Sequence, residues 1–403
     1  MKKRLLCAGL AAAMAVSLTA CGGSGSTAET KAEGSSASAE AKAEGGSEAA
    51  VFKIGGIGPI TGGAAVYGMA VQHGTELAVN EINAAGGING YQIEFQFQDD
   101  EHDAEKSVNA YNTLKDWGMQ VLVGTTTSAP CLAVADKSAA DNMFQITPSG
   151  SVVECAANPN VFRICYSDPD QGAASATYIG EHKLASKIAV IYDSSDVYSS
   201  GVYEKFAQEA PAQGIEIVAS EAFTADSNKD FSTQLQKAKD AGAEMVFLPI
   251  YYTEASLILQ QANTMGFAPL FFGVDGMDGI LQVEGFDTSL AEGLMLLTPF
   301  AADATDDLTV KFVKAYEEAY GETPIQFAAD AYDAVYAVKA AIEDAKATPD
   351  MSVSDLCEAM KTSMLNIKLD GLTGVGMTWT EDGEPHKEPK AVKIVNGAYA
   401  AME

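Results

Sequence analysis

The stretch Val121-Leu-Val-Gly-Thr-Thr-Thr-Ser-Ala-Pro130 passes from an apolar run through four hydroxyl side chains to a proline. The apolar run follows the helix-like segment Tyr111–Trp117, so it predicts a buried parallel strand. Gly124 frees the backbone after the strand. Pro130 suits the first turn of a helix, whose unpaired N–H groups attract a carboxylate or a phosphate. The stretch therefore predicts a small-anion site; the alternative is an ordinary capped turn, of which every doubly wound protein has several.

The same alternation of strand and helix continues on both sides of this stretch. Val51–Ile57 and the alternating Ile93, Phe95 and Phe97 are typical of strands, and residues 67–84 carry apolar or small side chains at helical spacing. Short strands that alternate with amphipathic helices predict an α/β fold rather than a sandwich or a helical bundle.

A second run of strands and helices begins after Asp168-Pro-Asp-Gln-Gly172. Two such units in tandem predict two Rossmann-like lobes. The helices expected at residues 307–320 and 327–347 have no strand partners near them in sequence, so the chain is expected to return to the first lobe and, from Val375, to cross once more. The expected boundaries are residues 51–166 and 300–374 for the N-terminal lobe, and 167–299 and 375–403 for the C-terminal lobe. Three crossover segments, near Tyr166–Asp168, Pro299 and Gly374, are expected to join the lobes.

The chain begins with a pattern typical of a lipoprotein. Met1-Lys-Lys-Arg4 precedes the apolar run Leu5–Ala15 and then Leu18-Thr-Ala-Cys21. These features predict a signal peptide at residues 1–20 and a lipid on the Cys21 thiol. The apolar run is too short for the alternative, a permanent membrane span. Residues 21–50 carry no aromatic side chain and no aliphatic one larger than alanine. They are expected to be a flexible tether that holds an extracytoplasmic protein to the outer face of the cell membrane.

Charge and cysteine content restrict the classes of partner. The formal net charge is −30, and the only charged residues that removal of residues 1–20 takes away are basic. Such a surface repels nucleic acid and anionic lipid, and solubility outside the cell accounts for it. No pair of cysteines has CxxC spacing. Cys155 and Cys165 flank a short loop that contains a proline and could pair in an oxidising compartment, although sequence cannot fix the connectivity.

Polar and aromatic side chains recur where the predicted strands end. In open α/β sheets ligands lie beyond the carboxyl ends of the strands. The residues found there are Pro59-Ile-Thr-Gly-Gly63 with Tyr67, Gly124–Ser128, Pro148-Ser-Gly-Ser151, Asp193–Tyr198, Tyr251-Tyr252 and Asp275. A carboxylate can accept hydrogen bonds from Ser128 and Ser151, while an ammonium can pair with Asp275 and lie against Tyr198 or Tyr251. The set therefore predicts a zwitterion site. The alternatives are a solvated turn for the acid and ordinary packing for each tyrosine alone.

Catalytic and cofactor motifs are poor by comparison. The sequence has no GxSxG elbow, no GxxxxGK loop and no HExxH, and it has four histidines. Gly56-Ile-Gly58-Pro lacks the third glycine of a dinucleotide fingerprint. Asp99-Asp-Glu-His-Asp103 is interpreted as a solvated loop, because consecutive residues of one turn cannot all converge on one ion. We expect no catalytic residue, no metal and no cofactor.

Several segments follow the pattern of a known family. They are Ile54-Gly-Gly-Ile-Gly-Pro-Ile-Thr-Gly62 with Tyr67-Gly68, Val79-Asn-Glu-Ile-Asn-Ala-Ala-Gly-Gly-Ile88-Asn-Gly90, Gln98-Asp-Asp100, Gly124-x-x-x-Ser128-x-x-x-x-Ala133, Thr147-Pro-Ser-Gly-Ser151, Phe162-Arg163, Asp168-x-x-Gln-Gly172 and Tyr198-x-x-Gly201. From about Val51 to its end, the chain resembles the extracytoplasmic substrate-binding proteins of branched-chain amino acid ABC transporters. These proteins have the type 1 periplasmic-binding fold.

The resemblance implies a role for each matching residue. Ser128 and Ser151 would bind the α-carboxylate of the ligand with help from the backbone of Ser149 and Gly150, and Asp275 would bind its α-ammonium. Tyr67, Tyr198, Tyr251 and Phe327 would wall the side-chain pocket. Asp275 is one methylene shorter than a glutamate of the family. The half-cystines that some members carry near the second strand are absent, and His102 stands there instead.

The resemblance also implies a mechanism. The lobes would close on an amino acid, most simply a branched-chain or other apolar one, and the monomeric protein would deliver it to the permease subunits of an ABC transporter. A sensor of the same fold, which feeds a signalling receptor, would use the same site. An enzyme would need a nucleophile and base, or a metal set, among the strand ends, and none is found there.

Overall fold

The computed structural model describes residues 50–402. The predicted signal peptide, Cys21 and all but the last residue of the predicted tether lie outside these residues.

A five-stranded parallel sheet, with strand order β2-β1-β3-β4-β5, forms the centre of the first lobe. Its strands are β1 (Phe52–Gly58), β2 (Ile93–Asp99), β3 (Val121–Gly124), β4 (Phe144–Thr147) and β5 (Val161–Arg163). The helices that connect them are α1 (Ala65–Ala84), α2 (Ala104–Trp117) and α3 (Ser128–Asp141). Every residue of β3 and β4 is buried, as expected for central strands of a parallel sheet that helices cover.

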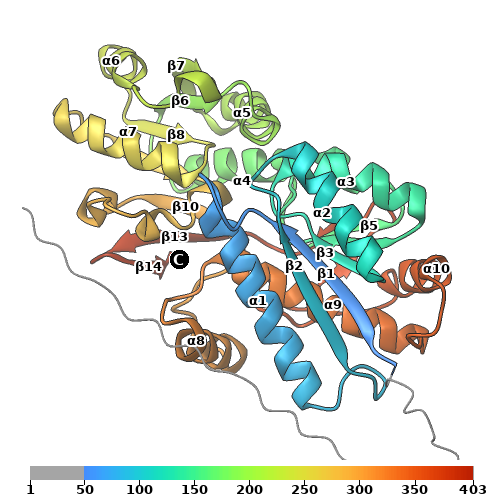
Figure 1. Ribbon diagram of the computed structural model, residues 1–403. Coiled ribbons are helices and arrows are strands. Elements are labelled where there is room, and N and C mark those ends of the chain that lie inside the picture. The colour runs from blue at the N-terminus through green and yellow to red at the C-terminus, as the bar shows by residue number, and fades with distance from the viewer. Residues whose placement is uncertain (1–49, 403) are drawn as a thin grey trace, which may run out of the picture. The chain divides into compact units, whose positions relative to one another are not determined.

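Three later helices, α8 (Asp307–Tyr320), α9 (Gln326–Ala345) and α10 (Val353–Met364), return to the first lobe. There α9 and α10 pack on the same sheet and α8 packs on α1 (Figure 1). α9 lies against α1, and Gly74 is where the two helices meet: a Cβ atom at this position would be 2.1 Å from the carbonyl oxygen of Ala328. The absence of a side chain there lets the two backbones approach.

A seven-stranded sheet, with order β14-β13-β10-β9-β8-β6-β7, forms the centre of the second lobe. The parallel strands are β6 (Lys187–Asp193), β7 (Glu216–Phe223), β8 (Met245–Leu248), β9 (Leu270–Gly273) and β10 (Met295–Thr298), and the antiparallel ones are β13 (Lys390–Val395) and β14 (Ala398–Ala401). The α-helices are α4 (Asp168–Glu181), α5 (Val197–Glu209), α6 (Ser232–Asp240) and α7 (Tyr252–Thr264).

Short elements complete the chain. The 3-10 helices are η1 (Val153–Ala156), η2 (Ala210–Gln213), η3 (Ala225–Ser227), η4 (Asp275–Met277), η5 (Ile280–Gln282) and η6 (Thr288–Ala291), and β11 (Thr378–Trp379) pairs with β12 (Pro385–His386). The chain passes between the two sheets three times: after β5, after β10 and before β13. The prediction of an α/β fold with two Rossmann-like lobes is confirmed, while the exact domain boundaries stay predictions.

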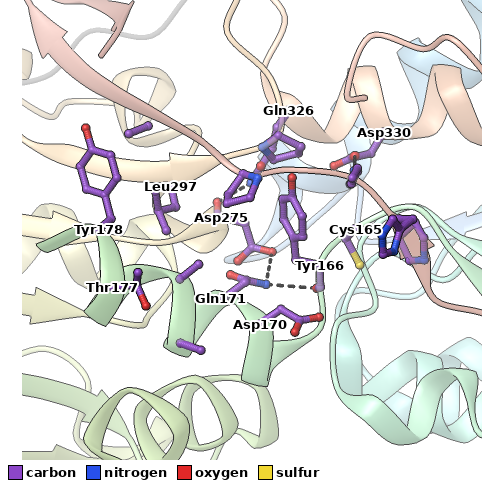
Figure 2. A pocket seen from close by; sticks show the side chains of 18 of the residues that line it. Cys165, Tyr166, Asp170, Gln171, Thr177, Tyr178, Asp275, Leu297, Gln326 and Asp330 are labelled. Carbon is purple, nitrogen blue, oxygen red and sulfur yellow. Dashed lines mark hydrogen bonds and ion pairs between the residues drawn. The ribbon is translucent and has the colours of Figure 1, made fainter. Parts of the chain in front are cut away.

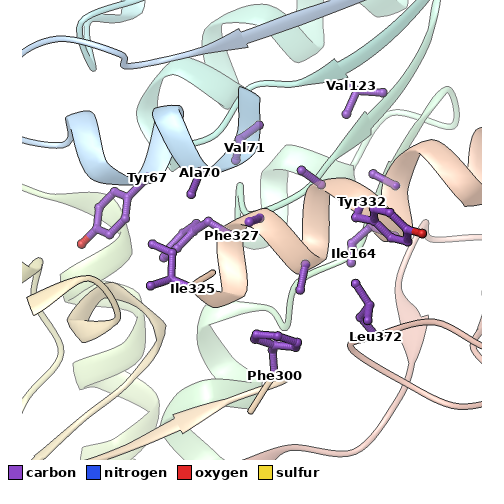
Figure 3. Close-up of a cluster of buried hydrophobic side chains, with 14 of the residues drawn as sticks. Tyr67, Ala70, Val71, Val123, Ile164, Phe300, Ile325, Phe327, Tyr332 and Leu372 are labelled. Atoms are coloured by element: carbon purple, nitrogen blue, oxygen red, sulfur yellow. The ribbon is translucent and has the colours of Figure 1, made fainter. Parts of the chain in front are cut away.

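One hydrophobic cluster contains residues of both lobes (Figure 3). Tyr67 of α1 and Phe327 of α9 belong to it, and their ring centroids are 4.3 Å apart. Ile164 and Phe300, which belong to the first two crossover segments, are buried in the same cluster. Packing therefore fixes the aromatic side chains of the site and the crossovers together.

Candidate ligand-binding site

The predicted residues converge on one small cavity between the lobes. The cavity is lined by Tyr67, Thr126, Thr127, Ser128, Ser149, Ser151, Tyr198, Tyr251, Asp275, Gly276 and Phe327. This set holds all the predicted binding residues except Gly150. They come together because the carboxyl ends of β1, β3 and β4 in one lobe face those of β6, β8 and β9 in the other.

Ser128 and Ser151 form the polar side of the cavity in the first lobe. Ser128 is the first residue of α3, and its Oγ lies 3.3 Å from Ser151 Oγ. The backbone N–H groups of Ser151 and Val152 donate to the same Ser128 Oγ, at 3.2 and 3.3 Å. The N-cap Thr127 makes no side-chain cap hydrogen bond, so the first N–H groups of α3 remain for an anion. Hydroxyls and a helix N-terminus together suit a carboxylate.

Gly150 differs from its expected role. Its N–H donates to Thr147 Oγ1 at 2.7 Å, and its carbonyl accepts from Arg163 at 3.3 Å. Both backbone groups are therefore occupied within the protein, and Gly150 supports the loop rather than the ligand. A Cβ atom here would lie 2.7 Å from Cys131 Sγ, so the loop needs glycine at this position.

Arg163 holds the loop that carries Ser151. Its guanidinium is fully buried, and it donates to the carbonyls of Gly150, Ser151, Val152 and Val153 at 2.6 to 3.3 Å. Its Nε lies 3.2 Å from Glu384. Trp379 in β11 donates to the Arg163 carbonyl at 2.8 Å, so the third crossover segment braces the same loop.

Asp275 is the acid of the second lobe, and it is not a solvated turn residue. It is 9% exposed and follows β9 in η4. Tyr198 donates to Oδ1 at 2.6 Å and Gln171 donates to Oδ2 at 2.9 Å. Burial raises the pKa of Asp275 to about 6, against the two hydrogen bonds that lower it, so the group is mostly ionised at neutral pH. An ionised, buried carboxylate is a suitable partner for an ammonium group.

Sequence reasoning missed a second buried acid, Asp168, at the start of α4. It is 1% exposed, and neither carboxylate oxygen has a hydrogen-bond partner among the described residues. Its backbone N–H donates to the Ser151 carbonyl at 3.0 Å, so it lies beside the carboxylate side of the cavity. Burial raises its pKa well above the usual range. The signal that could have found it was the segment Asp168-x-x-Gln-Gly172, which was interpreted only as a family pattern.

The hydroxyls of Tyr67 and Tyr198 are bound within the protein. Tyr67 Oη donates to the carbonyl of Gly276 and accepts from the N–H of Tyr252, while Tyr198 Oη is bound to Asp275 and to the Gly276 N–H. Tyr251 stacks on Tyr198 with ring centroids 5.2 Å apart. Because these hydroxyls already have partners, the walls they form are apolar.

The contacts of Tyr67 also bring the lobes together. Further hydrogen bonds join Val66 N to Tyr252 Oη and Thr253 Oγ1 to the Gly63 carbonyl, at 3.2 and 2.9 Å. The enclosed cavity measures about 10 Å³, which is room for about one water molecule. An amino acid can enter only if the lobes separate.

His102, which stands where some relatives have a half-cystine, contacts both lobes. Its Nδ1 lies 2.9 Å from Thr127 Oγ1, and its ring meets Tyr251 edge-on at 5.6 Å. Burial lowers its pKa, so the ring is neutral near pH 7. In the neighbouring loop Asp99 binds Ile60 N and Asp103 caps α2. Among residues 50–402, no three His, Cys, Asp or Glu side chains are placed to hold a metal ion.

The predicted pairing of Cys155 with Cys165 is wrong for this structure, in which both are buried free thiols. Cys155 Sγ points to the Ser128 carbonyl at 3.7 Å, whereas Cys165 lines a different cavity at the first crossover. Cys155 lies in η1, before β5, and Cys165 follows β5. Their proximity in sequence therefore does not bring the two sulfurs together.

The fold and the cleft define a class, the two-lobed solute-binding proteins with the type 1 periplasmic-binding fold. The chain belongs to the periplasmic binding protein family, whose model matches residues 51–398. Within residues 50–402, no helix combines the length and the apolar character that a membrane crossing requires.

Characterised relatives and solved structures agree with this assignment. The Leu/Ile/Val-binding protein homolog 3 of Brucella melitensis is 32% identical over 75% of this chain and 81% of its own length. The leucine-, isoleucine-, valine-, threonine- and alanine-binding protein of Pseudomonas aeruginosa is 28% identical, over 76% and 82%. The branched-chain amino acid transporter substrate binding protein LivJ from Streptococcus pneumoniae, in complex with isoleucine, has a TM-score of 0.79 and 28% identity over 87% of this chain and 98% of that one. The leucine binding protein LivK from Thermotoga maritima has a TM-score of 0.78 and 26% identity, over 88% and 98%.

Proposed function

We propose that this protein captures a branched-chain or other small apolar amino acid between its lobes and delivers it to the permease of an ABC importer. The observation that carries the proposal is the distribution of polar groups that have no full set of partners inside the protein. The first lobe offers the Ser128 and Ser151 hydroxyls with the N-terminus of α3, and the second lobe offers the carboxylate of Asp275. A carboxylate suits the first set and an ammonium the second.

The remaining walls favour an apolar side chain. The hydroxyls of Tyr67 and Tyr198 are bound within the protein, and Thr126 Oγ1 donates to the Ile57 carbonyl at 3.3 Å. Phe327 closes the cavity against the Tyr67 ring. A ligand side chain with its own hydrogen-bonding group would therefore lose its water without gaining a partner. The relatives are named for binding leucine, isoleucine and valine, and these names support the same ligand class.

Capture follows from the division of the site between the lobes. A zwitterion that contacts Ser128 in one lobe and Asp275 in the other binds the closed arrangement more tightly than the open one, so it shifts the population towards closure. We propose that the closed monomer docks on the permease, and that a lipid on Cys21 and the tether of residues 21–50 keep it near the membrane. No catalytic step is assigned to it.

The test is isothermal titration and thermal unfolding of the purified protein with leucine, isoleucine and valine. A ligand at 100 times its Kd should add about 2.7 kcal/mol to the free energy of unfolding. Isocaproate, which lacks the ammonium half of the zwitterion, should bind far more weakly. Asp275→Asn should reduce the shift with leucine, while Asp226→Asn, in an exposed 3-10 helix, should not. If no amino acid binds, the zwitterion site is wrong.

A further inference from the structure

A second and larger cavity lies at the hinge, and Asp275 lines both this cavity and the ligand site. Figure 2 shows Asp275 among the residues of the larger cavity. We call it the hinge cavity. Its volume is about 550 Å³, within the range of small-molecule sites. α4 and β10 of the second lobe, α9 of the first lobe and all three crossover segments line it, the last through Tyr166, Pro299 and Lys387.

The hinge cavity contains a buried acceptor without a donor. Gln171 is 4% exposed; its Nε2 donates to Asp275 Oδ2 at 2.9 Å and to the Tyr166 carbonyl at 3.4 Å, while its Oε1 has no hydrogen-bond partner. The hydroxyls of Tyr166 and Tyr178, which also line the cavity, are unpaired as well. Buried polar groups are nearly always paired, so their concentration on one cavity points to a ligand that carries donors.

The charges of the lining exclude an anion. Asp170, Glu181, Asp275 and Asp330 all line the cavity. Lys387 is already used, because its Nζ lies 3.3 Å from Asp330 and 5.1 Å above the Tyr166 ring. The apolar part of the lining includes Ala174, Leu297 and Pro299, and Thr177, Gln326 and His386 add polar groups.

We propose that the hinge cavity is a second small-molecule site, which takes a primary amine with an apolar body. The ammonium group donates to Gln171 Oε1 near the carboxylates, and the body packs against Ala174, Leu297 and the tyrosine rings. Because Gln171 holds Asp275 Oδ2, the two cavities share one hydrogen-bonded pair of side chains.

Occupation of the hinge cavity should tighten amino acid binding. The cavity is lined by both lobes, so its shape changes when they rotate about the crossovers. A molecule that fits it in this arrangement favours the arrangement in which Tyr67 contacts Gly276 and Tyr252. The coupling is reciprocal, so an amino acid should also tighten amine binding. This coupling rests on the proposed function, whereas amine binding itself does not.

The test uses 2-phenylethylamine as the probe and 3-phenylpropionate as the matched anion, with titration calorimetry on the full protein. The amine should bind, the anion should not, and leucine affinity should rise when the amine is present. Ala174 and Thr177 lie on the partly exposed face of α4 that lines the cavity. Ala174→Trp and Thr177→Trp should each raise the Kd of the amine at least about tenfold, and the leucine Kd measured in the absence of amine should stay unchanged. Two variants are used so that a folding failure of one leaves the other.

Ser128→Ala distinguishes the two sites, because it should weaken leucine binding and leave amine binding unchanged. Competition between amine and leucine, loss of amine binding in Ser128→Ala, or full amine binding in both tryptophan variants would each overturn the second site. Absence of amine binding would overturn it as well. If leucine fails to bind while the amine still does, the proposed function is wrong and the hinge cavity stands.

Discussion

The pH dependence of ligand affinity follows from the buried state of Asp275. Burial raises the pKa of this carboxyl from 3.8 to about 6 in the protein without ligand. Because the folded-state pKa lies above the unfolded value, ionised Asp275 destabilises the unliganded protein at neutral pH, on the order of 3 kcal/mol. This stability is regained as the pH falls below about 6 and the carboxylate becomes protonated. The ammonium of an amino acid binds only the ionised form. Affinity should therefore fall as the pH falls.

The size of the effect can be worked from the same pKa. At pH 7.5 almost all Asp275 is ionised, while at pH 5 about a tenth is, so Kd should rise about tenfold between them. Asp168 does not line the cavity, but its backbone N–H binds the Ser151 carbonyl, and burial also raises the pKa of its carboxyl, so its ionisation near the site changes the affinity in the same direction. Burial lowers the pKa of His102, so this ring is protonated less readily than a free imidazole as the pH falls.

Titration calorimetry with leucine between about pH 5 and 7.5, in buffers of different ionisation enthalpy, would measure both the affinity and the proton released on binding. Asp275→Asn should weaken leucine binding about 10- to 100-fold at pH 7.5, since it removes a charge-assisted hydrogen bond worth about 1.5–3 kcal/mol. In this variant the affinity should depend on pH only through Asp168. Asp275→Glu should restore the pH dependence. A Kd that is constant over this range, or that falls with acid, would refute the assignment of Asp275 to the ammonium.

Three further predictions concern the first lobe. Ser128→Ala should weaken leucine binding about tenfold, measured by calorimetry beside Ser232→Ala on the distant α6. Arg163→Met should lower the free energy of unfolding by about 3 kcal/mol or more in a urea titration, since four carbonyls lose their donor. It should also abolish leucine binding, and retained leucine affinity would contradict the positioning role of Arg163. Gly74→Ala should destabilise by about 1–3 kcal/mol, whereas Gly63→Ala, with no atom within 4 Å, should not.

Most of the candidate site could be predicted because parallel strands deliver their following residues to one edge. Ser128, Tyr198 and Tyr251 each follow an apolar run that is long or regular enough to be recognised, so their grouping needed no tertiary information. The burial of Asp275 did need it, because the sequence Asp275-Gly276 is equally typical of a solvated turn until Tyr198 and Gln171 are known to contact it.

Other features have no local signal. β5 and β10 are short, with three and four residues, and neither was predicted. β5 pairs with the preceding strand β4, whereas β10 pairs with β9 and with β13, which lies far along the chain. Asp168 follows a crossover rather than a strand, and an acid in the first turn of a helix is ordinarily explained by the helix dipole. The directions of Cys155 and Cys165 depend on side-chain packing, which spacing along the chain does not determine.

The hydrogen bonds of Tyr67 to the Gly276 carbonyl and the Tyr252 N–H join the lobes through protein atoms alone. Part of the closure free energy is thus independent of cargo. An importer that recognised only the closed outline would also accept empty protein and hydrolyse ATP without moving a solute. In such a transporter, the strength of this tyrosine latch would set the rate of idle ATP turnover, so selection on Tyr67 would balance tight capture against wasted energy in the cell.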